Sequence, residues 1–415
     1  MEEKIVLNID NSDLEDIVKK NEELALDDKK AKRTWLVFLI IGIVALLGGV
    51  ACLLFVFLKP PEIKTALAYP EIPSKVDVEE TYSALTGEVL KDAGLKNAPL
   101  YCIQVPNGLD GGRPQAGLTE AGVMFEAIAE AGITRFAALF QRPTTAIIGP
   151  VRSLRIYFLN WDTPFDCTIV HAGGSQEAMA ALRSGGYKEM DENYYYMYRG
   201  TAGSRLWNNL FTTSSDLEQF GSDSGYNTSN INGFSRLTPE QAEKARVDGI
   251  VEEKLNITKA AEKDTSKLVP EVSNITFRFG STPSFNVNYI YDVTTNSYLR
   301  RYADGIKHEV YKCSDGDLGE VNPEDNCSMT QLAPKVVIAM IVQERLSSDG
   351  VHEDITSIGS GTAYVFQNGK VTVGTWNKGS IGEQIKFLDE SGNEISLIPG
   401  QTIISAVPNY GGVEY

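Results

Sequence analysis

Several arginine residues lie close together in a chain that is otherwise strongly acidic. Arg135, Arg142, Arg152 and Arg155 fall within one short segment, although the 415-residue sequence has a formal net charge of −17. A guanidinium group binds a carboxylate or a phosphate through a planar fork of N–H donors. This grouping therefore predicts a site that recognises an anionic group.

The turn Gly149-Pro150 directly precedes two of these arginines. A helix that starts near Val151 would carry Arg152 and Arg155 three residues apart on one face. The free N–H groups of its first turn would also favour an anion. We expect Arg113 and Arg135 at other loop ends of the same α/β layer. The alternative interpretation is that the arginines pair with nearby carboxylates, namely Glu120, Glu126, Glu130 and Asp162.

The motif "VHAGGS" at residues 170–175 predicts a strand that runs through Gly173 and Gly174 into a helix capped by Ser175. Such a loop lies at the carboxyl end of a sheet, where open α/β folds bind ligands. His171 is the one weak candidate for a catalytic acid or base. The alternative is an ordinary capped helix with a packed histidine. The motif matches neither the P-loop nor the dinucleotide fingerprint, and no GxSxG elbow is present.

Other polar clusters have plain structural interpretations. Glu126 and Glu130, one turn apart on a predicted helix, read as a solvated face rather than as an acid–base pair. The acidic loop between residues 313 and 327 reads as solvated, because Gly319 stands where an EF-hand needs an oxygen ligand.

The aromatic and histidine residues leave more than one possibility open. The cluster "NYYYMYRG" at residues 193–200, with Trp207 nearby, either lines a glycan groove or fills a core. His308 and His352 are expected at the surface or at a strand edge.

The five cysteines predict one disulfide and no metal site. Cys313 and Cys327 bracket a polar loop, and a bridge between them is permitted outside the cytoplasm. Cys102 and Cys167 lie in apolar runs and are expected to be two buried thiols, although neighbouring strands could pair them. No Cys/His spacing indicates zinc, and no cofactor is predicted.

One segment near the N-terminus predicts a membrane anchor. Trp35 to Leu58 carries no charge over 24 residues, which is long enough to span a bilayer. The basic run "KKAKR" before it places the N-terminus in the cytoplasm and residues 59–415 outside. The acidic net charge argues against nucleic acid as a partner.

The remaining sequence predicts an α+β protein with two folded domains. The first domain alternates strands and helices, including a helix over residues 117–132, and the second reads as hairpins with a tight turn at Asn368-Gly369. The expected organisation is a cytoplasmic arm (1–33), a transmembrane helix (34–58), a linker (59–97), an α/β domain (98–268) and a β-rich domain (269–415).

Several motifs together resemble one family. The segments "RPQAGLTEAGVMFEAIAEAGITRFAALFQ", "IGPVRSLRIYFLNW", "VHAGGSQEAM" and "NNLFTT", and the later "YDVTTNSYLRRYADGIKH" and "GTAYVFQNGKVTVGTWNKGS", resemble the two domains of the DUF3048 family of YerB-like, membrane-anchored bacterial proteins. The resemblance covers residues 98–212 and 275–408. It implies architecture and location, since no activity is established in the family.

The chain departs from the family pattern at three places. Family members usually carry Pro-His where this chain has Trp207 and Asn208, and Asn208 cannot take a proton. An acid tends to follow the second-domain histidine after a short gap, whereas Glu309 follows His308 directly. Many relatives resemble lipoproteins, but this chain has no lipobox cysteine, since Cys52 lies within the apolar run.

The function expected from these features is binding at the bacterial cell envelope rather than catalysis. The ligand would be an anionic envelope component or another envelope protein. Two alternatives stay open: a hydrolase or transferase on cell-wall or phosphate-bearing substrates with His171 as acid or base, and a scaffold without a small ligand. The expected ligand-binding residues are Arg113, Arg135, Arg152, Arg155, His171, Gly173, Gly174, Ser175 and Asn209.

Overall fold

The fold was obtained as a computed structural model, which describes residues 30, 33–35, 82–200, 208–254, 270–280, 282–313, 323 and 327–415, with the side chains of 248–254 excepted. Met1–Pro70 and Glu71–Tyr415 form separate units. Among the described residues, no helix is long and apolar enough to cross a membrane. The predicted cytoplasmic arm and the predicted span at 34–58 lie almost entirely outside the described residues.

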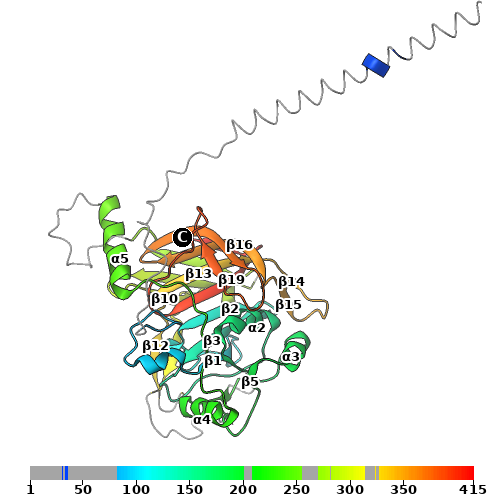
Figure 1. The fold of residues 1–415 in the computed structure, drawn as a ribbon, viewed down its shortest axis with the longest axis vertical. Coiled ribbons are helices and arrows are strands. Elements are labelled where there is room, and N and C mark those ends of the chain that lie inside the picture. Colours follow the sequence, from blue (N-terminus) through cyan, green and yellow to red (C-terminus); the bar gives the residue numbers. More distant parts are fainter. Residues whose placement is uncertain are drawn as a thin grey trace, which may run out of the picture. The chain divides into compact units, whose positions relative to one another are not determined.

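A ten-stranded sheet forms the centre of the second unit and takes strands from both predicted domains (Figure 1). At the junction of the two sets, β19 runs parallel to β2, and Thr402 pairs with Val123. The predicted boundary at 268/269 lies outside the described residues. In spatial order the strands are β18 (Lys386–Leu388), β17 (Lys370–Lys378), β16 (Gly359–Gln367), β13 (Val336–Val342), β19 (Thr402–Pro408), β2 (Val123–Glu130), β3 (Ile133–Gln141), β1 (Leu100–Pro106), β4 (Thr168–Val170) and β5 (Lys188–Met190).

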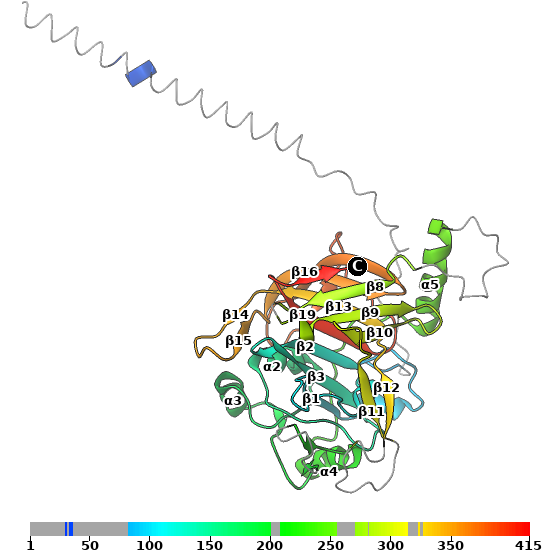
Figure 2. The same ribbon diagram turned by 180° about the vertical axis from the view of Figure 1, so that it is seen from behind.

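Different elements cover the two faces of this sheet. Figures 1 and 2, which view the unit from opposite sides, show α2 in front of one face and a second sheet in front of the other. The second sheet has the order β10 (Ser297–Tyr302), β9 (Val287–Asp292), β8 (Asn274–Arg278), β20 (Gly412–Glu414). The short pairs are β6 (Tyr198–Arg199) with β7 (Leu210–Phe211), β11 (Glu309–Lys312) with β12 (Ser328–Gln331), and β14 (Glu344–Leu346) with β15 (Glu353–Ile355).

The helices are short and few in the described part of the chain. They are α2 (Ile156–Asp162), α3 (Gln176–Arg183), α4 (Ser214–Ser224) and α5 (Pro239–Lys254). Short 3-10 turns lie at Ala93–Asn97, Leu118–Glu120, Thr163–Phe165 and Pro283–Phe285. The overall class is therefore α+β and rich in strands, as expected.

Several local predictions are confirmed. Ser175 caps α3, because its side chain accepts a hydrogen bond from the N–H of Ala178. Asn368 and Gly369 both have positive φ and connect β16 to β17 as a tight hairpin turn. The predicted linker ends earlier than expected, however, because Leu85 is buried in the core and Ala93–Asn97 forms a 3-10 turn.

The helix predicted over residues 117–132 is wrong, because Val123–Glu130 forms strand β2. Its alanines and glutamates favour a helix locally, but β2 lies between β19 and β3 and is buried on both faces. A strand in that position needs apolar or small residues throughout rather than an alternating pattern. Tertiary pairing has therefore overridden local propensity.

The helix predicted to start near Val151 is also wrong. Residues 151–155 are not helical, and α2 begins only at Ile156, with Arg155 as its N-cap in an extended conformation. The N–H groups of Val151 and Arg152 donate to the carbonyls of Leu210 and Gln104. Because these bonds hold the segment extended, Arg152 and Arg155 do not share a helix face.

A β-bulge in β2 separates the two glutamates that were predicted on one helix face. Ile128 pairs with Thr134, but Glu130 pairs with Ile133, so one extra residue is inserted between them. Glu126 contacts Thr134, whereas Glu130 contacts Arg135. Since Thr134 and Arg135 are consecutive in β3, the two glutamates lie on opposite faces of the sheet.

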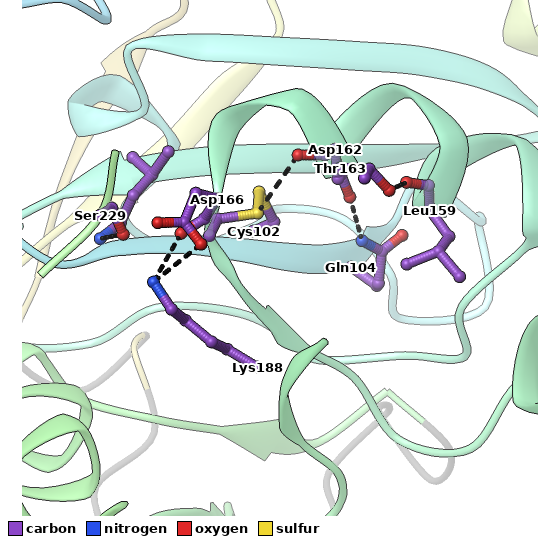
Figure 3. Close-up of a disulfide and its surroundings, with 10 residues drawn as sticks. Cys102, Gln104, Leu159, Asp162, Thr163, Asp166, Lys188 and Ser229 are labelled. Carbon is purple, nitrogen blue, oxygen red and sulfur yellow. Dashed lines mark hydrogen bonds and ion pairs between the residues drawn. A yellow bond between two sulfur atoms is a disulfide. The ribbon is translucent and has the colours of Figure 1, made fainter. Parts of the chain in front are cut away.

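The four cysteines in the described part of the chain form two disulfides. The predicted Cys313–Cys327 bridge is confirmed. Cys102 and Cys167 are bonded, with Cα atoms 5.8 Å apart (Figure 3), so the favoured expectation of two buried thiols is wrong and the alternative of pairing across neighbouring strands holds. Strands β1 and β4 are parallel neighbours with Cys102 opposite Ile169, which brings Cys167, just before β4, within bonding distance.

A buried carboxyl group lies beside this disulfide. Asp162, at the end of α2, is fully buried, and Gln104 donates a hydrogen bond to its Oδ2 at 3.2 Å (Figure 3). Burial raises the pKa of Asp162 well above its ordinary range, although the bond from Gln104 opposes this. The folded protein therefore keeps Asp162 protonated at pH values where the unfolded chain does not.

The substitution Asp162→Asn should remove a pH dependence of stability. When the pKa of a carboxyl group is higher in the folded than in the unfolded protein, the unfolded chain ionises first as pH rises. Between the two pKa values the free energy of unfolding therefore falls by about 1.4 kcal/mol per pH unit. We expect the variant to match the wild type near pH 4 and to become the more stable protein as pH rises toward 8. Urea denaturation at several pH values measures this difference, and parallel curves for the two proteins would contradict it.

Candidate functional site

The carboxyl ends of three parallel strands meet at one edge of the central sheet. Strands β1, β4 and β5 are parallel neighbours and lead into Asn107, His171 and Asp191. Extended residues 151–155 cross this edge, because the N–H of Ala172 donates to the carbonyl of Arg152 and the N–H of Leu154 donates to that of Gly173. The fold thus brings the arginine segment and the "VHAGGS" loop together, as expected.

Two of the predicted arginines share one carboxylate. Arg135 donates to Glu130 Oε1 at 2.8 Å, and Arg155 donates to Glu130 Oε2 at 2.5 Å. The side chains of Arg135 and Arg155 are 4% and 7% exposed, whereas that of Glu130 is 26% exposed. Arg135 also donates to the carbonyl of Ser153, which fixes it against the crossing segment.

The charges around Glu130 are unevenly matched. Burial, together with the nearby charges of Arg155 and Arg152, lowers the pKa of Arg135 to about 10, although the charge of Glu130 opposes this shift. Burial disfavours ionised Glu130, but Arg135 and Arg155 outweigh this and hold its pKa below the ordinary value. We name Arg135, Arg152, Arg155 and Glu130 the arginine cluster. It contains three guanidinium groups and one carboxylate.

Arg113 does not join the arginine cluster. Its Nε donates to Asn107 Oδ1 at 2.8 Å, and Asn107 in turn donates to Thr134. Because Thr134 and Arg135 point to opposite faces of β3, Arg113 lies on the other face of the sheet from the cluster. The expectation that all four ligand-binding arginines converge on one spot is therefore wrong, since the structure divides them between two faces.

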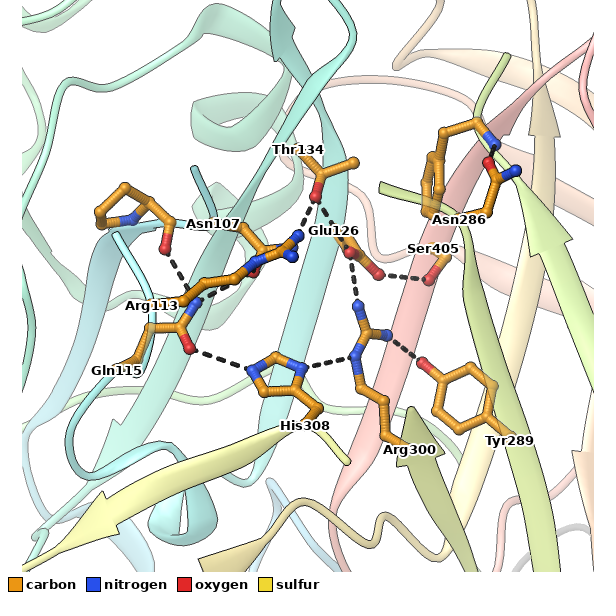
Figure 4. Close-up of polar contacts among 12 residues, drawn as sticks. Asn107, Arg113, Gln115, Glu126, Thr134, Asn286, Tyr289, Arg300, His308 and Ser405 are labelled. Carbon is orange, nitrogen blue, oxygen red and sulfur yellow. Dashed lines mark hydrogen bonds and ion pairs between the residues drawn. The ribbon is translucent and has the colours of Figure 1, made fainter. Parts of the chain in front are cut away.

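A fully buried ion pair occupies the face on which Arg113 lies. Arg300 on β10 donates to Glu126 on β2 at 2.6 Å, and neither side chain is exposed (Figure 4). Tyr289 accepts a hydrogen bond from the same guanidinium group, and Ser405 donates to the second oxygen of Glu126 at 3.0 Å. This network joins strands from both predicted domains.

His308 belongs to this network, so the prediction that it lies at the surface is wrong. It is fully buried, accepts a hydrogen bond from Arg300 at Nδ1, and bonds Gln115 Oε1 through Nε2 at 3.0 Å. Since arginine can only donate, Nδ1 is unprotonated and Nε2 donates to Gln115. Burial lowers the pKa of His308 well below its ordinary value, with Arg300 adding to the effect.

His171 is held by partners at both ring nitrogens. Nδ1 lies 2.9 Å from the carbonyl of Gly173, and Nε2 lies 3.2 Å from Glu189 Oε1. The side chain is fully buried, although its partners Glu189 and Asp191 are partly exposed. Asp191 also accepts the N–H of Gly173. This arrangement suits a loop-fixing histidine better than an acid or base that meets a substrate.

The other predicted ligand residues are used within the loop region. Ser175 caps α3, and a Cβ at position 174 would lie only 2.9 Å from the sulfur of Met179, so Gly174 allows this close approach. Asn209 accepts from Arg199 and donates to the carbonyl of Gly200. The contacts of these four predicted ligand residues are therefore with neighbouring protein groups at this sheet edge: Gly173, Gly174, Ser175 and Asn209.

The remaining predicted clusters divide in the structure. In the aromatic cluster, Tyr195 is 91% exposed and Tyr194 is 63% exposed, whereas Met197 and Tyr198 are buried. Trp207 and most of the acidic loop lie outside the described residues.

His352 pairs with Asp349 at 2.6 Å and is partly exposed, which fits the expected strand edge. In the part of the chain that the structure describes, no group of His, Cys, Asp and Glu side chains could hold a metal ion.

Reasoning from sequence missed Arg300, although one signal was present. Arg300 and Arg301 are consecutive in a predicted strand, and consecutive side chains point to opposite faces. If one face of that strand is buried, one of the two arginines must be buried as well. A buried arginine in turn requires a buried acid, which is Glu126.

Together these features define a β-rich α+β protein in which an N-terminal and a C-terminal segment complete one sheet. Residues 85–227 match the family model described as "Protein of unknown function (DUF3048) N-terminal domain", and residues 275–404 match the corresponding C-terminal domain. The chain belongs to the DUF3048 family, which confirms the resemblance seen in its motifs.

One bacterial protein is similar in both sequence and structure. "Putative lipoprotein YerB" of Bacillus subtilis (strain 168) is 26% identical over 364 residues, which cover 87% of this chain and 95% of that protein. The crystal structure of YerB from Bacillus subtilis superposes with a TM-score of 0.61 at 24% identity, over 80% of this chain and 99% of that chain. The structural likeness supports the fold.

Proposed function

We propose that this protein is a membrane-anchored binding protein of the cell envelope that recognises a phosphate-type anion at the arginine cluster. The observation that carries the proposal is that two buried arginines, Arg135 and Arg155, share the carboxylate of Glu130, with the charge of Arg152 acting on Arg135. Two guanidinium groups on one carboxylate leave a positive charge at this partly open sheet edge, and a guanidinium fork suits an oxyanion such as phosphate.

Location outside the cytoplasm has independent support. Two disulfides suit an oxidising compartment. The apolar segment Trp35–Leu58 follows a basic flank, which favours a single span with an external C-terminal part. The name of the similar Bacillus protein also contains the word lipoprotein. The proposed anchor here is the apolar segment, since the chain has no lipobox cysteine.

Binding is favoured over catalysis by the state of His171. Both of its ring nitrogens have protein partners, and the side chain is fully buried. A general acid or base must reach a proton of the substrate. The arginines alone can hold an anion but cannot transfer its protons at neutral pH.

A neighbouring carboxyl group adds little opposing charge. Glu344 lies near enough for its charge to act on Tyr157, on which the charges of Arg135 and Arg155 also act. Burial raises the pKa of Glu344 to about 7, and Tyr410 donates a hydrogen bond to it. It therefore carries only part of a negative charge at neutral pH and opposes the positive charge of Arg135 and Arg155 only in part.

The substitution Arg152→Ala should weaken the binding of inorganic phosphate by about tenfold or more, because one charge-assisted contact is lost. Arg142→Ala is the matched control in the same segment, since Arg142 forms only an exposed ion pair with Glu218. Glu130→Gln should have the opposite effect and strengthen phosphate binding, because it removes the competing carboxylate. Phosphate titrations of the full-length protein, followed by thermal unfolding at constant ionic strength, measure all three.

A phosphate response that is the same in wild type, Arg152→Ala and Arg142→Ala would contradict the proposal. Circular dichroism shows whether each variant is folded before titration. Turnover of a phosphate ester by the wild type that is lost in His171→Gln would favour the enzymatic alternative instead.

A further inference from the structure

Arg113 is a half-buried cation that forms no ion pair with any described residue. Its guanidinium carbon lies 3.8 Å from the ring centroid of Tyr302 and 5.1 Å from that of Phe285. Its Nε is committed to Asn107, which leaves the edge formed by Nη1 and Nη2 for a bidentate partner. Phe285 and Tyr302 come from the C-terminal family segment, so Arg113 lies where the two segments meet.

Two buried polar atoms at this place have no hydrogen-bond partner among the described residues. They are Nη2 of Arg113 and the hydroxyl oxygen of Tyr302. A buried donor without a partner is unfavourable, and such groups in folded proteins usually bind water or a ligand. The ring of Tyr302 also stacks on His308 at 4.6 Å, which holds it in position beside Arg113.

The charges around Arg113 leave one positive charge to be neutralised. Arg300, whose charge acts on Arg113, is already paired with Glu126. Asp304 acts on Arg113 only through space, and Asp110 accepts a hydrogen bond from Asn208 in the same loop region. A singly charged anion fits this balance better than a doubly charged one, since further negative charge would meet these two carboxylates.

We propose that Arg113 and Tyr302 form a second ligand site, which binds a single carboxylate group at the junction of the two family segments. The Nη1–Nη2 edge of Arg113 binds the carboxylate oxygens, and the Tyr302 hydroxyl donates to one of them. The rings of Phe285 and Tyr302 contact the apolar part of the ligand next to the carboxylate. This site lies on the opposite face of the sheet from the arginine cluster and does not depend on it.

The site is tested with sodium acetate as the probe and the full-length protein. Thermal unfolding is followed while acetate replaces chloride at constant ionic strength, and the same titration is repeated with inorganic phosphate. We expect acetate to stabilise the wild type in a saturable way. In Tyr302→Phe and Arg113→Lys the half-saturating acetate concentration should rise about tenfold, because a hydrogen bond to a charged group is lost.

Tyr302→Phe is informative because the hydroxyl has no hydrogen-bond partner within the described part of the chain. Without acetate, this variant should unfold at the same temperature as the wild type or slightly higher. Tyr157→Phe is the matched control, since the Tyr157 hydroxyl donates to the carbonyl of Ile128 at 2.6 Å. That control should unfold at a lower temperature but keep the full response to acetate.

Three outcomes would overturn the proposal. In the first, acetate raises the unfolding temperature no more than chloride does. In the second, the Arg113 and Tyr302 variants both respond to acetate as the wild type does. In the third, phosphate stabilises the protein through Arg113 more strongly than acetate does. The first two would mean that the two atoms bind only water. Arg152→Ala separates this result from the proposed function, because it should lose the phosphate response and keep the acetate response.

Discussion

The substitution Glu126→Gln should lower the free energy of unfolding by about 3–5 kcal/mol, because it leaves a buried arginine without its counter-charge. Arg300 and Glu126 are both fully buried, and their bond at 2.6 Å connects β10 to β2. The charge of Glu126 raises the pKa of Arg300 against the effect of burial, so the guanidinium stays ionised. In Glu126→Gln the Arg300 guanidinium therefore stays charged without a carboxylate partner, because it does not lose its proton.

Urea denaturation of the purified protein measures this loss. Glu414→Gln is the matched control, because it breaks the exposed Arg278–Glu414 pair, whose side chains are 53% and 59% exposed. That control should lose less than about 1 kcal/mol. A double variant, Glu126→Leu with Arg300→Met, should be more stable than Glu126→Gln, since no unpaired charge remains. Equal losses from Glu126→Gln and Glu414→Gln would contradict the importance of this pair.

Removal of the Cys102–Cys167 disulfide by a double alanine substitution should lower the free energy of unfolding by about 4 kcal/mol. The bond closes a loop with a sequence separation of 65, and an open chain of that length has many more unfolded conformations. It also connects β1 to the start of β4, which together form the edge that the arginine segment crosses.

The second disulfide provides the control. Cys313–Cys327 closes a loop with a sequence separation of only 14, so its removal should lower the free energy of unfolding by about 3 kcal/mol. A reducing agent breaks both bonds, so the reduced wild-type protein should lose more stability than either double-alanine variant. A larger loss from the shorter loop would show that loop closure does not explain the stabilisation.

Some features of the fold follow from a few neighbouring residues in the sequence and do not depend on tertiary contacts. Ser175 caps α3 because a short hydroxyl side chain before a helical run satisfies a free N–H. Cys313 and Cys327 are close enough in the chain to pair across one loop. The hairpin turn at Asn368-Gly369 depends only on two residues that tolerate positive φ. Each of these depends on a few neighbouring residues.

The arrangement of the arginines could not be read from the sequence. Spacing suggested that Arg113 would converge with Arg135, Arg152 and Arg155, but the face of the sheet on which each side chain lies depends on strand register. Arg135 and Thr134 point to opposite faces of β3, and the bulge in β2 moves Glu130 to the side of Arg135. One inserted residue thereby decides which acid meets which arginine.

The sequence by itself determined the family, the α+β class, the capped helix α3 and the short-range disulfide. Only the tertiary structure made residues 123–130 a strand, buried His308, and combined the two segments into one sheet. The reason is the range of the interactions. Caps, turns and short loops involve neighbours along the chain, whereas the pairing of β2 with β19 and of Glu126 with Arg300 joins residues far apart in sequence, whose combined burial outweighs local preference.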